Sequence, residues 1–205
     1  MPRAPADPRL AGRRLYLVCD ASFRRVEEAV AGGVDIVQLR DRSLADAELL
    51  VAARRMAEEC RELGVPFLVN DRPDIAVLAR ADGVHIGQDD LPPAEVRRIV
   101  GPGVLIGRST HAPAEIETAE GVDYIAVGPV YETPTKPGRS ATGTELVRYA
   151  AAWAPVAWFA IGGLDPATVP AVVAAGATRI VVVRAITEAP DPRAAALALR
   201  AALGE

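Results

Sequence analysis

The sequence is poor in cysteine and has no strong excess of charge of either sign, and each scarcity excludes a class of protein. Its 205 residues include two cysteines, too few for a disulfide framework, so we expect a reduced, cytoplasmic location. Cys19 and Cys60 have no metal-like or redox-like spacing, and we expect both in the core. The formal net charge of −4 gives no general attraction to nucleic acid or to an anionic membrane, and we expect neither as a partner.

Long apolar runs are also missing. The longest, residues 149–164, contains Pro155 and is too short to span a membrane. Residues 1–14 carry positive charge, but no apolar segment of the secretory type follows them. We predict a loose N-terminal arm over residues 1–14 and one catalytic domain over residues 15–205, since 50% of the chain is hydrophobic and suffices for a large core.

Short apolar runs rich in β-branched residues alternate with segments of helical periodicity. The runs predict strands at 15–20, 34–40, 66–71, 83–87, 104–109, 123–129, 156–163 and 179–186. Helical spacing recurs at 45–64, 72–81, 92–100, 112–121, 143–153, 165–176 and 191–203. Alternation of the eight strands with helical segments predicts an α/β fold, a compact (β/α)8 TIM barrel. An open doubly wound sheet is the alternative, because barrels typically need about 250 residues.

Polar residues gather where the predicted strands end, which is where the active site of a barrel lies. They are Asp20, Gln38, Arg40, Arg42, Asn70, Asp71, His85, Gln88, Asp89, Asp90, Ser109, Thr110 and His111. Several such residues on one rim make a better candidate for a site than any one of them alone.

Asp71 ends the third predicted strand, and Asp90 lies three residues after the fourth. Two carboxylates with few other oxygen ligands suit Mg²⁺, which is usually completed by water and by substrate phosphate. Both lie just before predicted helices, so helix capping by Asp71, and by Asp89 or Asp90, is the alternative interpretation.

Gln38 and Arg40 share one face of the second strand, because side chains two apart in a strand point the same way. The arginine fork suits phosphate oxygens, and an ion pair with Asp20 or Asp71 is the alternative. Gly162 and Gly163 end the seventh predicted strand, just before the next helix, where barrels often bind phosphate, although glycines are also ordinary turn residues.

Three polar side chains of the middle strands have structural interpretations beside functional ones. Ser109 and His111 could form a polar turn and a helix cap. His85 lies inside an apolar strand and is more typical of a hydrogen-bonded barrel histidine than of a catalytic base.

Seven motifs in order, "VQLRDR", "VNDRPDIA", "DGVHIGQDD", "IGRSTH", "DYIAVGPVYETPTK", "AIGG" and "VVRAI", resemble the thiamine-phosphate synthase family. The resemblance implies a (β/α)8 barrel and a transferase of thiamine biosynthesis. Its substrates would be a hydroxymethylpyrimidine diphosphate and a thiazole phosphate, coupled by a dissociative, Mg²⁺-assisted alkyl transfer with loss of pyrophosphate.

The resemblance also implies roles for individual residues. Gln38, Leu39, Arg40, Asp41, Arg42 and Asn70 would hold the pyrimidine diphosphate, Ser109 the pyrimidine, and Lys136 the pyrophosphate. Thr133, Pro134, Thr135, Gly163 and the Val183–Arg184 backbone would hold the thiazole phosphate, and Asp71 and Asp90 would bind Mg²⁺. Arg40, Lys136 and Ser109 are the expected catalytic residues. Arg42 departs from the family, which usually has lysine there, so its assignment rests on charge alone.

Lysine occurs once, and the other 22 of the 23 lysine and arginine residues are arginine. Lys136 lies in a loop rich in proline, threonine and glycine, which predicts a lid that carries its charge to the leaving group on closing. A solvated surface lysine is the alternative.

Two other functions fit parts of this pattern. A thiazole tautomerase would lack both metal aspartates and would have histidine in place of Pro129. A non-catalytic sensor of thiamine phosphate would have little need of the aspartates or of the lysine loop. Homo-oligomers are possible.

Overall fold

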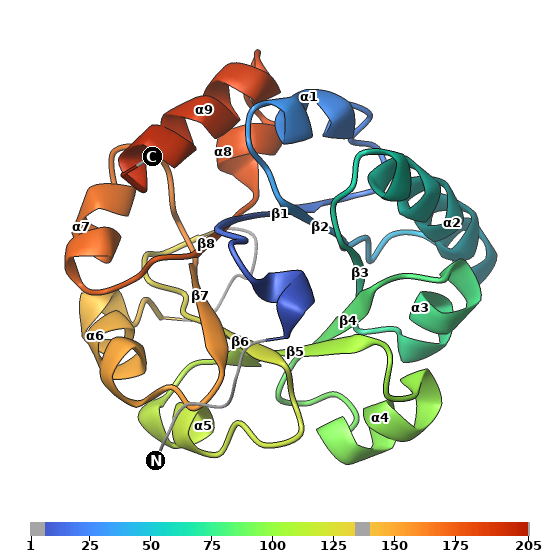
Figure 1. Cartoon of the computed structure of the whole chain (residues 1–205), viewed down its shortest axis with the longest axis horizontal. Coiled ribbons are helices and arrows are strands. Elements are labelled where there is room, and N and C mark those ends of the chain that lie inside the picture. The colour runs from blue at the N-terminus through green and yellow to red at the C-terminus, as the bar shows by residue number, and fades with distance from the viewer. Residues whose placement is uncertain (1–6, 134–139, 205) are drawn as a thin grey trace.

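The chain forms a closed barrel of eight parallel strands, ordered β1 to β8, in a computed structural model that describes residues 7–133 and 140–204 (Figure 1). The strands are β1 (Leu15–Cys19), β2 (Ile36–Leu39), β3 (Phe67–Asn70), β4 (Gly83–Ile86), β5 (Leu105–Thr110), β6 (Tyr124–Val127), β7 (Ala157–Ile161) and β8 (Ile180–Val182). Pairing of β1 with β8, with Tyr16 opposite Val181, closes the sheet. The predicted barrel is confirmed, and the open sheet is excluded.

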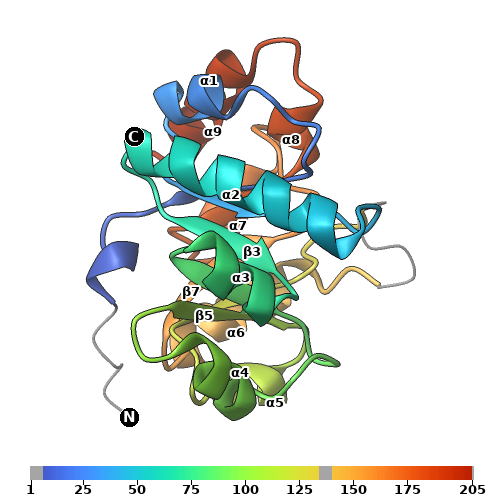
Figure 2. The same cartoon turned by 90° about the vertical axis from the view of Figure 1, so that its right-hand side faces the viewer.

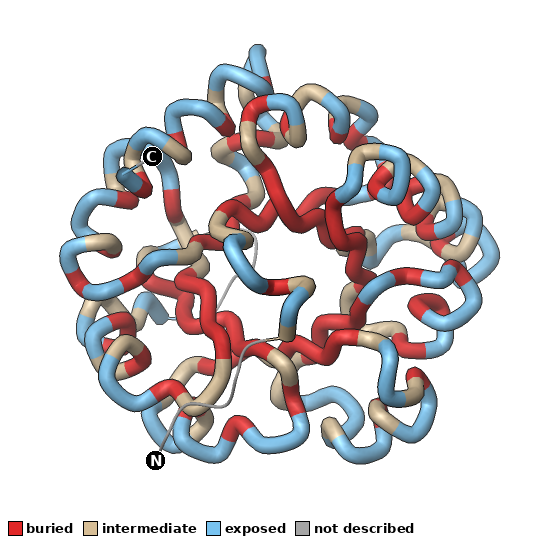
Figure 3. The backbone as a smooth tube through the Cα atoms, viewed as in Figure 1, coloured by how far each residue is buried: buried red, intermediate tan, exposed pale blue. Residues whose placement is uncertain are grey.

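Helices cover the outside of the barrel, with buried strands at the centre and exposed helix faces around them (Figure 3). They are α1 (Val26–Ala31), α2 (Asp46–Glu62), α3 (Pro73–Ala79), α4 (Pro93–Val100), α5 (Pro113–Glu117), α6 (Gly143–Trp153), α7 (Val169–Ala174), α8 (Arg184–Thr187) and α9 (Pro192–Ala202). Within the described ranges, none of them has the length and apolar character needed to cross a bilayer.

The end of the barrel strand β8 differs from the prediction. The strand stops at Val182, and a short helix, α8, occupies residues where the sequence predicted strand as far as 186. Val183 has φ −125° and ψ −91°, which turns the chain out of the sheet. An apolar run has no periodicity that reveals this break.

Two apolar cores lie on the two faces of the sheet. One fills the space between strands and helices, and the other fills the inside of the barrel. Tyr16, Tyr124 and Phe159 dominate the inner core, and their rings pack edge to face with centroids 5.5–6.0 Å apart. Alternation along each strand assigns one side chain to each core in turn.

The segment before β1 closes the end of the barrel at which the strands begin (Figure 2). A turn of 3₁₀ helix, η1 (Pro8–Leu10), places the fully buried Leu10 in the inner core. Arg9 donates a 2.6 Å hydrogen bond to the carbonyl oxygen of Gly103 and pairs with Asp7 at 2.8 Å. Residues 7–10 of the predicted loose arm are therefore packed, because a single leucine among prolines and arginines gives no periodic signal.

Candidate functional site

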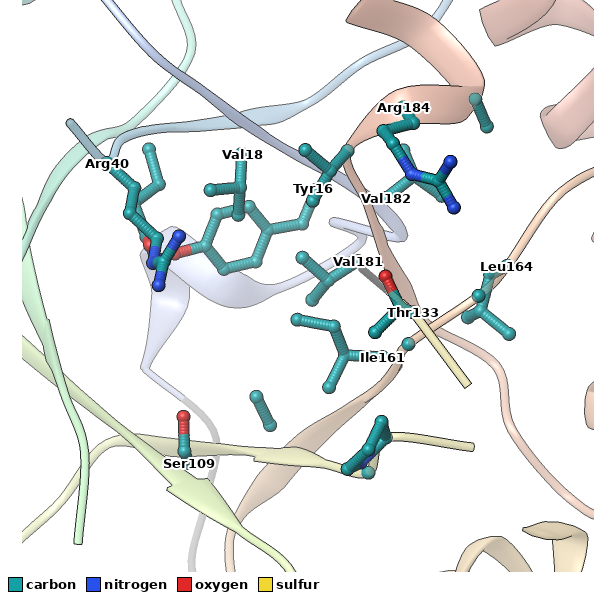
Figure 4. Close-up of a pocket in the computed structure, with 18 of the residues that line it drawn as sticks. Tyr16, Val18, Arg40, Ser109, Thr133, Ile161, Leu164, Val181, Val182 and Arg184 are labelled. Carbon is teal, nitrogen blue, oxygen red and sulfur yellow. The ribbon is translucent and has the colours of Figure 1, made fainter. Parts of the chain in front are cut away.

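A cavity of about 370 Å³ opens at the end of the barrel where the strands finish. Among the predicted site residues, the cavity is lined by Gln38, Arg40, Asn70, Ser109, Thr133, Gly163, Val183 and Arg184. Figure 4 shows Arg40 and Arg184 on opposite sides, with the apolar side chains of Ile161 and Val181 between them. The size suits a small ligand, and the lining combines an apolar floor with a few polar groups.

Arg40 is the main cationic group of one side of the cavity. Its Nε atom is buried and has no hydrogen-bond partner among the described residues. Burial lowers the pKa of the guanidinium, and the neighbouring charge of Arg42 lowers it further. The alternative ion pair with Asp20 or Asp71 is not among the ion pairs of the described chain. A buried, unpaired donor fits an anionic ligand.

Asp71 and Asp90 lie close together beside Arg40. Arg42 donates to the Asp71 carboxylate at 3.1 Å, and Asp90 accepts from the backbone N–H of Gly87 at 2.6 Å. Burial raises the pKa of Asp71, and the negative charge of Asp90 raises it further. Repulsion of this kind marks a place where a cation stabilises the pair. Arg40 lines the cavity, whereas Arg42, Asp71 and Asp90 lie next to it outside the lining, and the four together are called the charged wall below.

Helix capping does not explain the two aspartates. In the described structure, α3 is preceded by Arg72 and α4 by Pro92, and neither helix start is capped by a side chain. Asp71 instead has a positive φ of 61°, a conformation that aspartate tolerates better than most residues. Its backbone N–H donates to the carbonyl oxygen of His85 at 2.8 Å. The end of β3 is therefore held against β4, and the carboxylates of the two loops lie close together.

The donor set fits a divalent cation shared with a ligand. Among residues 7–133 and 140–204, no three histidine, cysteine, aspartate or glutamate side chains gather to hold a metal alone. Two neighbouring carboxylates, one of them with a raised pKa, suit Mg²⁺, and oxygens from water or phosphate would complete its shell.

The opposite side of the cavity is made mainly of backbone. Gly162 and Gly163 have φ values of 107° and 65° and lie against the start of the β6–α6 loop. A Cβ atom on Gly162 would lie 2.5 Å from Cα of Pro129, and one on Gly163 would lie 2.7 Å from Cβ of Tyr131. The backbone N–H of Tyr131 donates to Gly162 at 3.0 Å. Glycine is thus required by close packing as well as by φ.

The same side is completed by the turn from β8 into α8. Val183 is half-buried and Arg184 is exposed, and both line the cavity. Gly162, Gly163, Val183 and Arg184 together are called the backbone wall below.

Ser109 and His85 lie on the floor of the cavity. His85 Nε2 is 3.0 Å from Ser109 Oγ, and His85 Nδ1 is 3.0 Å from the hydroxyl of Tyr124. The histidine is therefore hydrogen bonded within the barrel, as its apolar setting predicted, and it also lines the cavity. His111 contacts the carbonyl oxygen of Gly128 through Nδ1.

Other predicted site residues lie elsewhere. Leu39 is buried in the outer core, so its side chain points away from the cavity. Asp41 accepts hydrogen bonds from the backbone of Ala21 and from Ser43, which orders the β2–α2 loop. The predictions for Pro134, Thr135 and Lys136 fall outside the described residues.

Sequence reasoning missed Tyr16 and Tyr124, one in the cavity lining and the other directly beneath it. An aromatic residue inside an apolar strand is predicted to be a core residue, and both tyrosines do belong to the inner core. Their one distinguishing signal is alternation, because it points Tyr16 and Tyr124 into the barrel, toward Gln38 and His85.

Three comparisons with known proteins agree with one another. A family model described as thiamine monophosphate synthase matches residues 15–186. Thiamine-phosphate synthase of Thermus thermophilus is 52% identical over 198 residues, covering 91% of this chain and 95% of the relative. The Streptomyces avermitilis enzyme of the same name is also 52% identical, over 96% of this chain and 95% of its own. The solved structure of a thiamine phosphate pyrophosphorylase from Pyrococcus furiosus superposes with a TM-score of 0.85 at 29% identity, covering 94% and 96% of the two chains.

Proposed function

Because this chain belongs to the thiamine-phosphate synthase family, we propose that it couples a hydroxymethylpyrimidine diphosphate to a thiazole phosphate, giving thiamine phosphate and pyrophosphate. Family membership confirms the predicted class, a transferase that moves an alkyl group. The observation that carries the proposal is Arg40, whose buried Nε has no partner in the described structure and which lines the cavity beside two close carboxylates.

The charged wall suits the diphosphate. Breaking the bond between the methylene carbon and the diphosphate oxygen leaves the electron pair on the departing oxygen. Arg40 would stabilise that charge with its planar fork, in a site where burial strengthens the interaction. Asp71 and Asp90 would hold Mg²⁺, which when bound would supply further positive charge to the diphosphate. The predicted role of Lys136 at the same leaving group belongs to this proposal.

The backbone wall suits the thiazole phosphate. N–H groups in the turns after β7 and β8 can donate to phosphate oxygens, as they do in many barrels. A thiazole held there would present its ring nitrogen to the methylene carbon, and the nitrogen lone pair would form the new C–N bond. No protein nucleophile is needed for this step.

The floor between the two walls suits the cationic pyrimidine that cleavage leaves behind. Val18, Ile161 and Val181 present apolar surface there. Such surface excludes water, which would otherwise capture the methylene carbon.

Purified protein incubated with both substrates and Mg²⁺ tests the proposal. We expect pyrophosphate and thiamine phosphate in equal amounts, and no turnover after chelation of the metal. Isomerisation of a thiazole without metal would instead indicate a tautomerase, and binding of thiamine phosphate without turnover would indicate a sensor. Either result would overturn the proposed function.

A further inference from the structure

A chain of five buried polar side chains crosses the barrel at the floor of the cavity. Gln38 donates from Nε2 to the hydroxyl of Tyr16, which lies 3.0 Å from the hydroxyl of Tyr124. Tyr124 continues to His85 Nδ1 at 3.0 Å, and His85 Nε2 continues to Ser109 Oγ at 3.0 Å. The five residues come from β2, β1, β6, β4 and β5, so the chain joins two residues predicted to hold the pyrimidine diphosphate.

The chain is shielded from solvent. Each of its members has a relative exposure of 7% or less, and Tyr124 is fully buried. Burial raises the pKa values of Tyr16 and Tyr124, so both hydroxyls keep their protons. In such surroundings a lost hydrogen bond is costly, because water does not replace the missing partner.

The neighbouring strand makes room for the chain. Gly107 of β5 lies against the ring of Tyr124, and a Cβ atom there would be 2.0 Å from Cζ and 2.3 Å from the hydroxyl oxygen. Only glycine leaves space for the tyrosine to reach the barrel axis, and the Gly107 backbone does not need a positive φ.

The direction of hydrogen donation follows from the amide at one end. An amide nitrogen can only donate, so the Tyr16 oxygen accepts from Gln38. If Tyr124 also donated to Tyr16, the Tyr16 proton would have no acceptor among these five side chains, so the arrangement that satisfies every proton has Tyr16 donating to Tyr124 and Tyr124 donating to Nδ1 of His85. A neutral imidazole that accepts at Nδ1 carries its proton on Nε2 and donates it to Ser109.

We propose that this chain holds His85 in the Nε2–H tautomer and thereby makes Ser109 a hydrogen-bond donor toward the cavity. Tyr16, Tyr124 and His85 are then positioning residues, and Ser109 donates to an unprotonated ring nitrogen. The inference rests on the proposed function, which supplies an aminopyrimidine as the ligand. A donor at this place selects the neutral ring, and the neutral ring is the form that can share electrons with a cationic methylene carbon.

The tautomer can be measured without substrate. The protein contains two histidines, His85 and His111, so the ¹⁵N signals of His85 are assigned by comparing the wild type with His111→Gln. We expect the Nε2–H pattern for His85 at neutral pH, and a mixture of tautomers in Tyr124→Phe. A wild-type His85 in the Nδ1–H form would overturn the inference whatever the enzyme's activity.

Kinetics supply the second readout. We expect Tyr124→Phe to raise KM for the pyrimidine diphosphate by about tenfold and to leave KM for the thiazole phosphate unchanged, because one buried hydrogen bond and its aligned partners are lost. Tyr16→Phe tests the same chain if Tyr124→Phe folds poorly. An equal effect on both substrates would indicate a merely structural role and would contradict the inference.

Matched variants separate this result from failure of the proposed function. Tyr149→Phe removes a hydroxyl that contacts Glu117 on the outside of the barrel, and it should leave both KM values unchanged. His85→Gln keeps a donor toward Ser109 and should retain more activity than His85→Leu. If the wild type releases no pyrophosphate, the proposed function fails, while the tautomer measurement still decides the direction of the chain.

Discussion

The charged wall and the backbone wall provide their polar groups by different means. The charged wall uses side chains of the β2–β4 loops, with Arg42 and Asp71 paired at 3.1 Å and Asp90 nearby. The backbone wall uses turns in which glycine is required, with Gly162 and Gly163 at positive φ. Under the proposed function, the difference teaches that charge developing on a leaving group would be met by full side-chain charges, whereas a phosphate that is only held could be met by backbone donors.

The largest effect is expected on the charged wall. Asp71→Asn should lower kcat/KM by on the order of 10³-fold, since the carboxylate pair that would hold Mg²⁺ is lost. The thermal midpoint should not fall, because repulsion from Asp90 is relieved and an exposed ion pair with Arg42 contributes little. The matched control is Asp89→Asn, because Asp89 is exposed and precedes Asp90 in the sequence, and this variant should keep its activity. Full activity in Asp71→Asn would contradict the proposal that Asp71 and Asp90 hold Mg²⁺.

Arg40 should come next. Arg40→Gln is expected to lower kcat by about 10²-fold, because the buried fork no longer stabilises the leaving oxygen. Arg42→Gln should cost less, about tenfold, since that side chain is 68% exposed and solvent screens its charge. Steady-state kinetics with varied pyrimidine diphosphate measures both. A larger loss for Arg42 than for Arg40 would reverse their assigned importance.

A smaller effect is expected when the backbone wall is strained. Gly163→Ala should raise KM for the thiazole phosphate by about tenfold, because alanine at positive φ costs about 1–2 kcal/mol and its Cβ would press on Tyr131. The control is Gly103→Ala, which has ordinary φ and no atom within 4 Å of the new Cβ. An equal KM for the thiazole phosphate in the two variants would show that the backbone wall does not depend on the turn at Gly163.

The smallest effect is expected at Arg184. Arg184→Ala should raise KM for the thiazole phosphate by less than about threefold, since the side chain is exposed and the proposed contact is its backbone. Steady-state kinetics with varied thiazole phosphate, for the wild type and Arg184→Ala, measures the change in KM. A loss as large as that of Arg40→Gln would mean that the second wall also works through side-chain charge.

Much of the charged wall could be predicted from the sequence, whereas the hydrogen-bonded floor of the cavity could not. Asp71, Asp90 and Arg40 stand at the ends of predicted strands, and parallel strands bring such ends to one rim. Tyr16 and Tyr124 are ordinary core residues by pattern, and their hydroxyls gain meaning only when two distant strands face each other. The glycine pair and the family resemblance predict the residues of the backbone wall, but they do not predict its tight contact with Pro129 and Tyr131, because contact across a loop leaves no periodic trace.

By itself, the sequence determined the alternation of strands and helices and the polar residues at the strand ends, because both follow from local periodicity. Only the tertiary structure decided that Leu10 closes one end of the barrel, that α8 replaces the end of β8, and that five strands share one hydrogen-bonded chain. These features depend on closure of the sheet, which brings together residues as far apart in the chain as Tyr16 and Tyr124.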